Sequence, residues 1–107
     1  QDTILFDTDR YNIDATDQAA LAAQAQWLVR YPAKRVSVEG HADERGTREY
    51  NVALSERRSQ SVEKFLRVQG VAASQIEMVS YGEEKPAAYG SDEMSWAKNR
   101  RAELSYR

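Results

Sequence analysis

The segment of the chain whose residues could do chemistry runs over positions 40–51, with the sequence GHADERGTREYN. It contains one histidine, three carboxylates, two arginines and two glycines. Such residues serve acid–base catalysis by His41 with Asp43, metal ligation, or recognition of a charged ligand. The segment alone does not choose among these three kinds of site.

Catalysis at this segment would need more than His41 and Asp43. His41 is the single histidine of the chain, and no serine stands in a Gly-x-Ser-x-Gly elbow that could supply a nucleophile. A histidine at a strand-to-loop turn is more often a hydrogen-bonded structural residue. The residues therefore favour a protein that is not an enzyme.

A calcium loop is the metal site that the sequence comes nearest to, over residues 7–18, DTDRYNIDATDQ. The match ends after three residues. Tyr11 stands at the third ligand position, Asn12 replaces the turn glycine, and Gln18 replaces the bidentate glutamate. The chain has no cysteine for a thiolate site. We predict no metal site and no cofactor.

The elements that must position these side chains follow from apolar spacing, capping residues and turn residues. We expect strands at residues 3–6, 35–40, 76–81 and 101–107, and helices at 15–32 and 47–69. Residues 82–99 are expected to form a surface loop with a helical turn near Trp96. The order βαβαββ predicts one α+β domain over residues 1–107, a two-layer sandwich with both helices on one face of a mixed four-stranded sheet.

Local signals define several of these boundaries. Asp14 or Thr16 can cap the first helix. Thr47 is suited to cap the second helix, and Gly70 is suited to end it. In the last strand, RAELSYR, the alternation places apolar residues toward the core and the charged ones, Arg101 among them, outward. The two glycines of the 40–51 segment would permit a turn or a close backbone approach.

An arginine of the second helix stands out because of its position. With Leu54 set at zero on a helical projection, Arg58 falls at about 40°, inside the core-facing stripe. A desolvated guanidinium needs an anionic partner, which could be a carboxylate of the protein or a ligand. Alternatively, its side chain could extend past the helix edge to water.

The neighbourhood of Arg58 favours the ligand. It lies beside the end of the second strand, the edge where open α/β sheets usually bind ligands. Asp43 would be the nearest carboxylate, and Asn51 faces the same way from the helix. Together, an aspartate, an asparagine and an arginine around one crevice can hold an ammonium and a carboxylate.

Composition excludes several other classes of function. The 107 residues include 15 basic and 17 acidic side chains, for a net charge of -2. There is no concentrated positive field of the kind that nucleic acid binding requires. Nor is there an apolar run of the ~20 residues that span a bilayer.

Three segments resemble a known family: GHADERGTREYNVALSERRSQSV at 40–62, VSYGEEKP at 79–86 and KNRRAELSY at 98–106. They are similar to the OmpA-like peptidoglycan-binding domain, in the form found in its peptidoglycan-associated lipoprotein (Pal) branch. The similarity extends from FDTDRYNI at 6–13 to the C-terminus. Departures from the usual pattern occur at Ser59, where alanine is common, and at Arg48, where proline is common.

The resemblance implies a noncovalent contact with the cell wall of a Gram-negative bacterium. Its ligand would be the peptidoglycan peptide stem, principally meso-diaminopimelate. The protein would tether the outer membrane to the wall from the periplasmic side, through an N-terminal lipid anchor outside this chain. It would act in the Tol–Pal system with a TolB-like β-propeller as partner.

The resemblance also implies which residues hold the ligand. The family's key aspartate corresponds to Asp43 and would take the ammonium of diaminopimelate. Its key arginine corresponds to Arg58 and would take the carboxylate. The full set of expected ligand-binding residues is Phe6, Asp7, Ala42, Asp43, Arg45, Asn51, Leu54 and Arg58. Two alternatives stay open: a cell-wall hydrolase that uses His41 and Asp43, and a module that binds only proteins.

Overall fold

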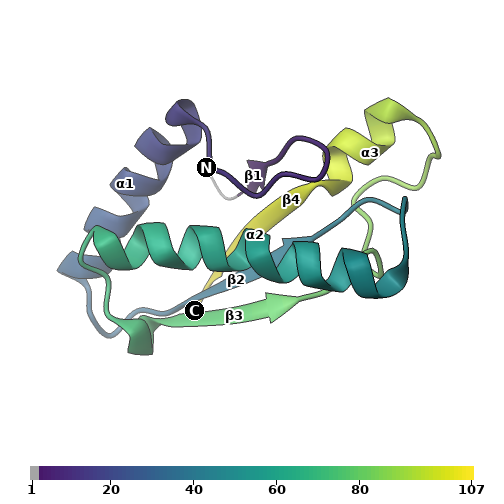
Figure 1. The fold of residues 1–107 in the computed structure, drawn as a ribbon. Helices are drawn as coiled ribbons and strands as arrows, with labels where there is room; N and C mark the ends of the chain where they lie inside the picture. Colours follow the sequence, from purple (N-terminus) through teal and green to yellow (C-terminus); the bar gives the residue numbers. More distant parts are fainter. Residues whose placement is uncertain (1–2) are drawn as a thin grey trace.

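The computed structural model describes residues 3–107 (Figure 1). Along the chain the elements are β1 (Thr3–Leu5), α1 (Ala15–Arg30), β2 (Val36–His41), α2 (Arg48–Val68), the short 3-10 helix η1 (Ala73–Gln75), β3 (Ile76–Ser80), α3 (Glu93–Asn99) and β4 (Arg101–Tyr106). None of the helices in this part of the chain has the length and apolar character to cross a membrane.

The four strands form one mixed sheet in the order β1-β4-β2-β3. β2 and β3 run parallel, while β4 pairs antiparallel with both β1 and β2. In Figure 1, α1 and α2 lie on the same side of the sheet, and α2 runs along β2. The predicted α+β architecture is thus confirmed.

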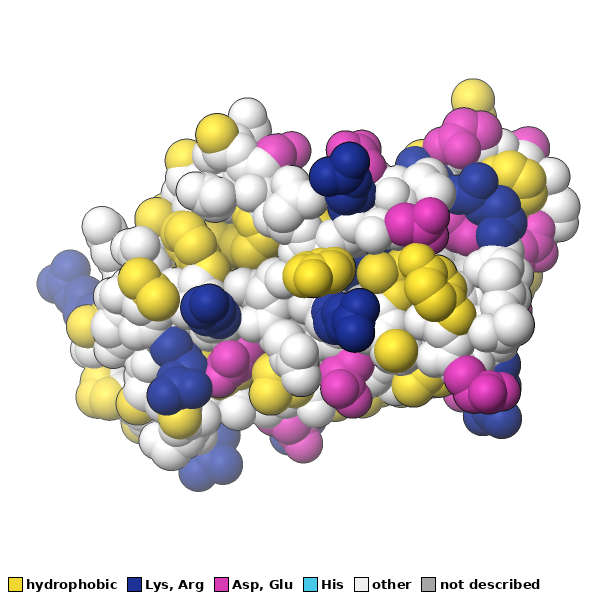
Figure 2. Space-filling model, in the orientation of Figure 1, with side chains coloured by type: hydrophobic (Ala, Val, Ile, Leu, Met, Phe, Trp, Pro, Cys, Tyr) yellow, Lys and Arg dark blue, Asp and Glu magenta, His cyan; other side chains and the backbone are white. Residues whose placement is uncertain are grey.

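The core fills the space between the sheet and the two long helices. Its fully buried side chains include Ile4, Leu21, Leu28, Val36, Val38, Val62 and Leu66. Burial of each such side chain contributes about 1.5–3 kcal/mol to folding. This layer holds α2 against β2. On the face of the molecule that Figure 2 shows, basic and acidic side chains are interspersed.

Side-chain caps define both long helices. Asp14 caps α1, because its carboxylate accepts the backbone N–H of Asp17 at 2.8 Å; Thr16 lies inside the helix. In α2, the Thr47 hydroxyl accepts the backbone N–H of Tyr50 at 3.1 Å, as the sequence predicted. Gly70 follows α2 with a φ of 107°, a conformation that favours glycine.

The helix α2 approaches β2 so closely that only glycine fits between them. A Cβ on Gly40 would lie 1.8 Å from the backbone oxygen of Ser55. On the helix, Ser55 and Ser59 are both buried and small, which lets the backbones come together. This contact brings the first turns of α2 directly beside the segment that leaves β2.

Two predictions about the C-terminal third need correction. Residues Glu93–Asn99 form a helix of two turns, capped by Asp92, where we expected a loop with one helical turn. Arg101 does lie on the outer face of the sheet, but it is only 5% exposed. Its Nη2 donates to the backbone oxygen of Lys85 at 2.9 Å, so the segment after β3 covers it.

Candidate functional site

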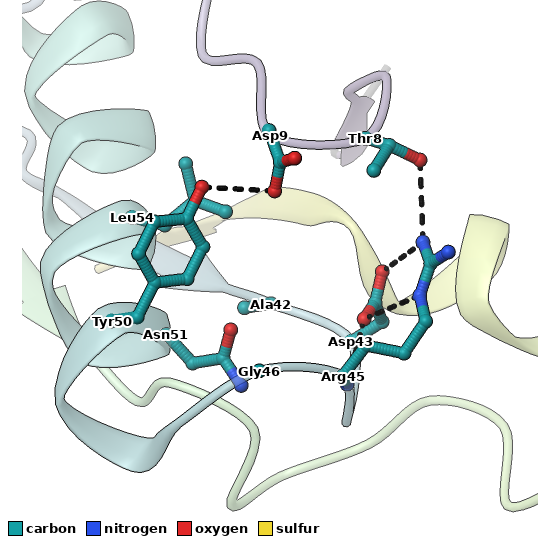
Figure 3. A pocket seen from close by; sticks show the side chains of 9 residues that line it. All are labelled: Thr8, Asp9, Ala42, Asp43, Arg45, Gly46, Tyr50, Asn51 and Leu54. Atoms are coloured by element: carbon teal, nitrogen blue, oxygen red, sulfur yellow. Dashed lines mark hydrogen bonds and ion pairs between the residues drawn. The ribbon is translucent and has the colours of Figure 1, made fainter.

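A crevice of about 180 Å³ opens at the carboxyl end of β2 (Figure 3). Three segments surround it: the loop after β1, the loop that joins β2 to α2, and the first turns of α2. Its lining residues are Thr8, Asp9, Ala42, Asp43, Arg45, Gly46, Tyr50, Asn51 and Leu54. Five of the eight predicted ligand-binding residues are in this set.

Asp43 places a carboxylate at this crevice and is only 7% exposed. The Arg45 guanidinium donates two hydrogen bonds to this carboxylate, with Nε 3.2 Å from Oδ1 and Nη2 2.9 Å from Oδ2. A second guanidinium, that of Arg100, lies 3.7 Å away. Burial raises the pKa of the Asp43 carboxyl, but the hydrogen bonds and charge of Arg45 outweigh it, so the pKa is lower than usual. The crevice therefore holds an ionised carboxylate beside two cations.

Arg45 is held in place by residues from both ends of the chain. Its Nη2 donates to the Thr8 hydroxyl at 3.2 Å, a contact drawn in Figure 3. The guanidinium carbon lies 4.4 Å from the centre of the Trp96 ring, within reach of a cation–π interaction. The indole N–H of Trp96 in turn donates to Glu44 at 2.8 Å. Thus α3, which the sequence predicted only as a helical turn near Trp96, orients a predicted site residue.

Asn51 lies on the first turn of α2 and is only 2% exposed. Its side-chain N–H donates to the Glu83 carboxylate at 2.6 Å, which fixes the orientation of the amide. Figure 3 shows the amide oxygen on the crevice side. The neighbouring Gly46 adopts a φ of 90°, and this turn brings Asn51 and Asp43 to the same crevice.

Asp9 and Tyr50 close the opposite wall, and sequence reasoning missed both. The Tyr50 hydroxyl donates to the Asp9 carboxylate at 2.9 Å, across 41 positions of sequence (Figure 3). Asp9 has a φ of 58°, a left-handed conformation that aspartate adopts more readily than most residues. The aspartate-rich turn DTDR could have drawn attention to Asp9, whereas its contact with Tyr50 leaves no signal in the sequence.

Arg58 does not line the crevice. It is fully buried, with 0% exposure, beneath the loop that follows β1. Its guanidinium donates to three backbone oxygens: Nε to Arg10 at 2.9 Å, Nη1 to His41 at 2.9 Å and Nη2 to Asp7 at 3.1 Å. The sequence led us to expect a carboxylate, a ligand or water as partner, and its partners within the protein are neutral carbonyls. Burial lowers the pKa of Arg58 to about 10, although the charge of Asp43 opposes this shift.

Phe6 and Asp7 also lie outside the crevice lining. Phe6 is buried in the core, with its ring centre 5.3 Å from the Arg58 guanidinium carbon. Asp7 has an exposed side chain, and it is its backbone oxygen that contacts Arg58. The next two residues, Thr8 and Asp9, provide the contribution of this loop to the crevice.

His41 lies on the outer face of the sheet and is only 3% exposed. Its ring stacks on Tyr81 with 5.2 Å between centres. We expected a hydrogen-bonded histidine, but neither ring nitrogen has a hydrogen-bond partner among residues 3–107. Burial lowers the pKa of His41 to about 4, and the charge of Arg101 acts in the same direction. The arrangement gives no support to a catalytic pair of His41 with Asp43.

Comparison with known proteins places this geometry in a family. The model of the OmpA family matches residues 5–100. A peptidoglycan-associated lipoprotein of Agrobacterium fabrum is 55% identical over 94% of this chain, and one of Pasteurella multocida is 51% identical over 97%. The chain spans 57% and 69% of the lengths of these two relatives.

Solved structures agree with these matches. The crystal structure of the peptidoglycan-associated lipoprotein of Burkholderia pseudomallei has a TM-score of 0.98 and 45% identity, covering 100% of this chain and 91% of that one. The C-terminal domain of Helicobacter pylori MotB, with a TM-score of 0.90 at 23% identity, covers 100% of this chain and 84% of that one and shares the fold. The chain therefore belongs to the OmpA family, in the branch represented by the peptidoglycan-associated lipoproteins.

Proposed function

We propose that this domain binds peptidoglycan noncovalently through the meso-diaminopimelate of the peptide stem. The observation that carries the proposal is the charge pattern of the crevice: the ionised Asp43 carboxylate lies beside the guanidinium groups of Arg45 and Arg100, and its charge also acts on the buried guanidinium of Arg58. The outer stereocentre of diaminopimelate carries an ammonium and a carboxylate on one carbon. A site that presents both signs of charge within a few ångströms is suited to that group.

In this proposal Asp43 receives the ammonium. The amide oxygen of Asn51, on the crevice side in Figure 3, is a second acceptor for the same group. Arg45 binds the Asp43 carboxylate in the free protein, and its side chain is 37% exposed, so the proposal requires Arg45 to give up its contacts with Asp43 and Thr8 as the ligand enters. The ligand's ammonium would thus replace one cation on Asp43 with another.

Arg58 is proposed to receive the ligand's carboxylate. A guanidinium has five N–H groups, and three of those on Arg58 have partners among residues 3–107. Two remain for a carboxylate. Because the loop over residues 7–10 covers the guanidinium, this contact requires that loop to shift when the ligand enters.

The same arrangement would discriminate between wall types. A stem with lysine in place of diaminopimelate has the ammonium but lacks the carboxylate. Its binding would leave Arg58 without that partner. A charge-assisted hydrogen bond of about 1.5–3 kcal/mol corresponds to a preference of roughly ten- to a hundredfold.

At the level of the whole protein, we propose a tether rather than an enzyme. It would act at the periplasmic face of the outer membrane of a Gram-negative bacterium, attached by an N-terminal lipid anchor outside this chain. The support is the family membership and the names of the relatives, which are peptidoglycan-associated lipoproteins. A TolB-like β-propeller in the Tol–Pal system is the proposed protein partner, and no nucleic acid is expected.

Titration with purified muropeptides tests the ligand. The diaminopimelate form should bind at least tenfold more tightly than the lysine form, and Asp43→Asn should weaken the binding. Glu56→Gln is a matched control, because it removes a single exposed carboxylate from α2 outside the crevice lining. Equal affinity for both stems, or unchanged affinity in Asp43→Asn, would contradict the proposal.

Two further measurements test the other parts. Incubation with sacculi should release no soluble fragments beyond a heat-inactivated control; time-dependent release would favour the hydrolase alternative. Saturating muropeptide should weaken binding of a TolB-like propeller if both use the same edge of the fold. An unchanged propeller affinity would place the two sites apart.

A further inference from the structure

Three potential metal ligands come together on the outer face of the sheet, the side opposite the two long helices. Glu39 on β2 stands directly opposite Glu103 on β4 in the antiparallel register. His41 follows two residues after Glu39 and so points to the same face. One ligand atom from each of the three side chains lies within 4.8 Å of the other two.

His41 is the least satisfied member of this group. Its side chain is 3% exposed, and both ring nitrogens lack a hydrogen-bond partner among the described residues. Buried polar atoms in native proteins are almost always paired, so an unpaired one calls for an explanation. A nitrogen that faces two carboxylates from inside the protein has the setting of a metal ligand.

Of the two carboxylates in the cluster, that of Glu39 has no ion pair among residues 3–107. Two carboxylates that stand directly opposite each other on neighbouring strands repel. Arg101, which is opposite His41 in the register, forms an ion pair with Oε2 of Glu103. That pair balances one of the two negative charges. The nearby Lys85 ammonium lies over the Tyr81 ring, 4.4 Å from its centre.

We propose that Glu39, His41 and Glu103 form a binding site for a divalent transition-metal ion of the Zn²⁺ class, which bridges β2 and β4. One imidazole nitrogen and two carboxylate oxygens are a ligand set that Zn²⁺ accepts, with a fourth position left for water. Ca²⁺ and Mg²⁺ prefer six or more oxygen ligands, which these residues do not supply.

The geometry needs only a small adjustment for such an ion. Zn²⁺ binds nitrogen and oxygen at about 2.0–2.2 Å, so its ligand atoms lie about 3–4 Å apart. The two glutamates are part-buried rather than locked in the core, and rotation about their side-chain bonds can close the remaining gap. The bound ion would join the two central strands on the face that the helices leave uncovered.

The chain's single histidine makes the test direct, because imidazole NMR signals can arise only from His41. Untagged protein, first treated with a chelator, is titrated with Zn²⁺ alone. We expect one Zn²⁺ per chain, a shift of the His41 ring resonances and a higher thermal midpoint, with no such changes on addition of Mg²⁺.

Variants locate the site. Glu39→Gln should weaken Zn²⁺ binding at least tenfold, as should Glu103→Gln. Glu77→Gln is the matched control, because Glu77 pairs with Ser37 on the same face of the neighbouring strand and stands outside the cluster; it should keep the wild-type affinity.

Two results would overturn the site. One is an unchanged His41 spectrum at millimolar Zn²⁺. The other is Zn²⁺ binding that Glu39→Gln leaves intact, which would place the ion elsewhere on the protein. Because His41 is buried and its replacement could unfold the domain, the two glutamate variants carry the test.

Discussion

Arg58 shows how one buried charge can be satisfied by the backbone instead of by a carboxylate. Its three carbonyl partners come from the loop after β1 and from the last residue of β2. A guanidinium in this position links two segments that no strand pairing joins. The residue therefore has a structural role, whatever it contributes to the ligand.

We predict that Arg58→Ala destabilises the fold by about 3–5 kcal/mol, because it removes three hydrogen bonds to backbone carbonyls, that of His41 in the interior, and opens a cavity. Arg58→Lys should recover only part of this, since an ammonium cannot reproduce the planar fork. Urea unfolding of both variants measures the free energy of unfolding. If Arg58→Ala matched the wild type, the carbonyl contacts would contribute nothing net to stability.

Asp43 makes stability depend on acid pH. Its pKa is lower in the folded protein than the ordinary value of about 3.9, so the folded state favours the ionised form. The stabilisation is fully present above about pH 4 and is lost as the pH falls through the folded-state pKa. We predict that, from about pH 5 down to about pH 2, the free energy of unfolding falls less in Asp43→Asn than in the wild type.

The comparison needs no ligand, because the shift arises from Arg45 and Arg100 within the protein. Unfolding curves at several pH values for the two proteins give the difference directly. Parallel pH dependences would mean that the Arg45 fork does not stabilise the ionised carboxylate in solution.

At the scale of elements, the contact between α2 and β2 depends on the absence of a side chain at Gly40. A methyl group there would lie 1.8 Å from the Ser55 backbone oxygen, and neither backbone can yield without moving the helix. We predict that Gly40→Ala costs more than about 3 kcal/mol of unfolding free energy.

Gly70→Ala is the control for this prediction. Its Cβ would have ordinary space, with Val29 at 3.6 Å, but its φ of 107° would strain an alanine by about 1–2 kcal/mol. Denaturant unfolding should therefore rank Gly40→Ala well below Gly70→Ala in stability. The reverse ranking would show that α2 can move off the sheet at little cost.

The elements also show what the sequence could and could not predict. The caps at Thr47 and Gly70 and the alternation in β4 have local causes, so the strands and long helices were predictable. The placement of Asp43 and Asn51 at one crevice was predictable too, because Asp43 follows the end of a strand and Asn51 lies on the face of the helix that turns toward it. By contrast, α3 is short and is fixed by contacts of Trp96 and Arg100 with distant parts of the chain.

Parts of the site escaped prediction for a related reason. Asp9 and Tyr50 meet only because the loop after β1 folds over α2. The carbonyl partners of Arg58 are backbone atoms, which every residue has and no pattern marks. The family resemblance named the expected ligand-binding positions, but it could not show that Arg58 lies beneath the crevice and not on its wall.

At the scale of the whole molecule, the crevice joins three separated segments, so a ligand should stabilise the entire fold. At a concentration of a hundred times Kd, binding adds about 2.7 kcal/mol to the free energy of unfolding. For a domain of this size that corresponds to a rise of roughly 10–20 °C in Tm. We predict this rise for a diaminopimelate muropeptide, measured by differential scanning calorimetry.

The lysine-type muropeptide at the same concentration is the control, and it should raise Tm by much less. Similar Tm shifts with the two muropeptides would mean that the crevice does not recognise the second carboxylate of diaminopimelate. No shift with either would contradict binding of the peptide stem at this crevice.

The place of β4 in the sheet also sets the order in which the chain can fold. β4 is the last strand of the sequence, yet it lies between β1 and β2 and pairs with both. The Phe6 N–H donates to the Arg100 carbonyl at 2.9 Å, and the Arg100 side chain donates back to the Phe6 carbonyl. Pairing β1 with β4 closes a loop that spans nearly the whole chain, which has a high entropic cost and slows folding. During synthesis from the N-terminal end, no strand pair of this sheet is available until residues 76–80 add β3 to β2, and the sheet is completed only when residues 101–106 arrive.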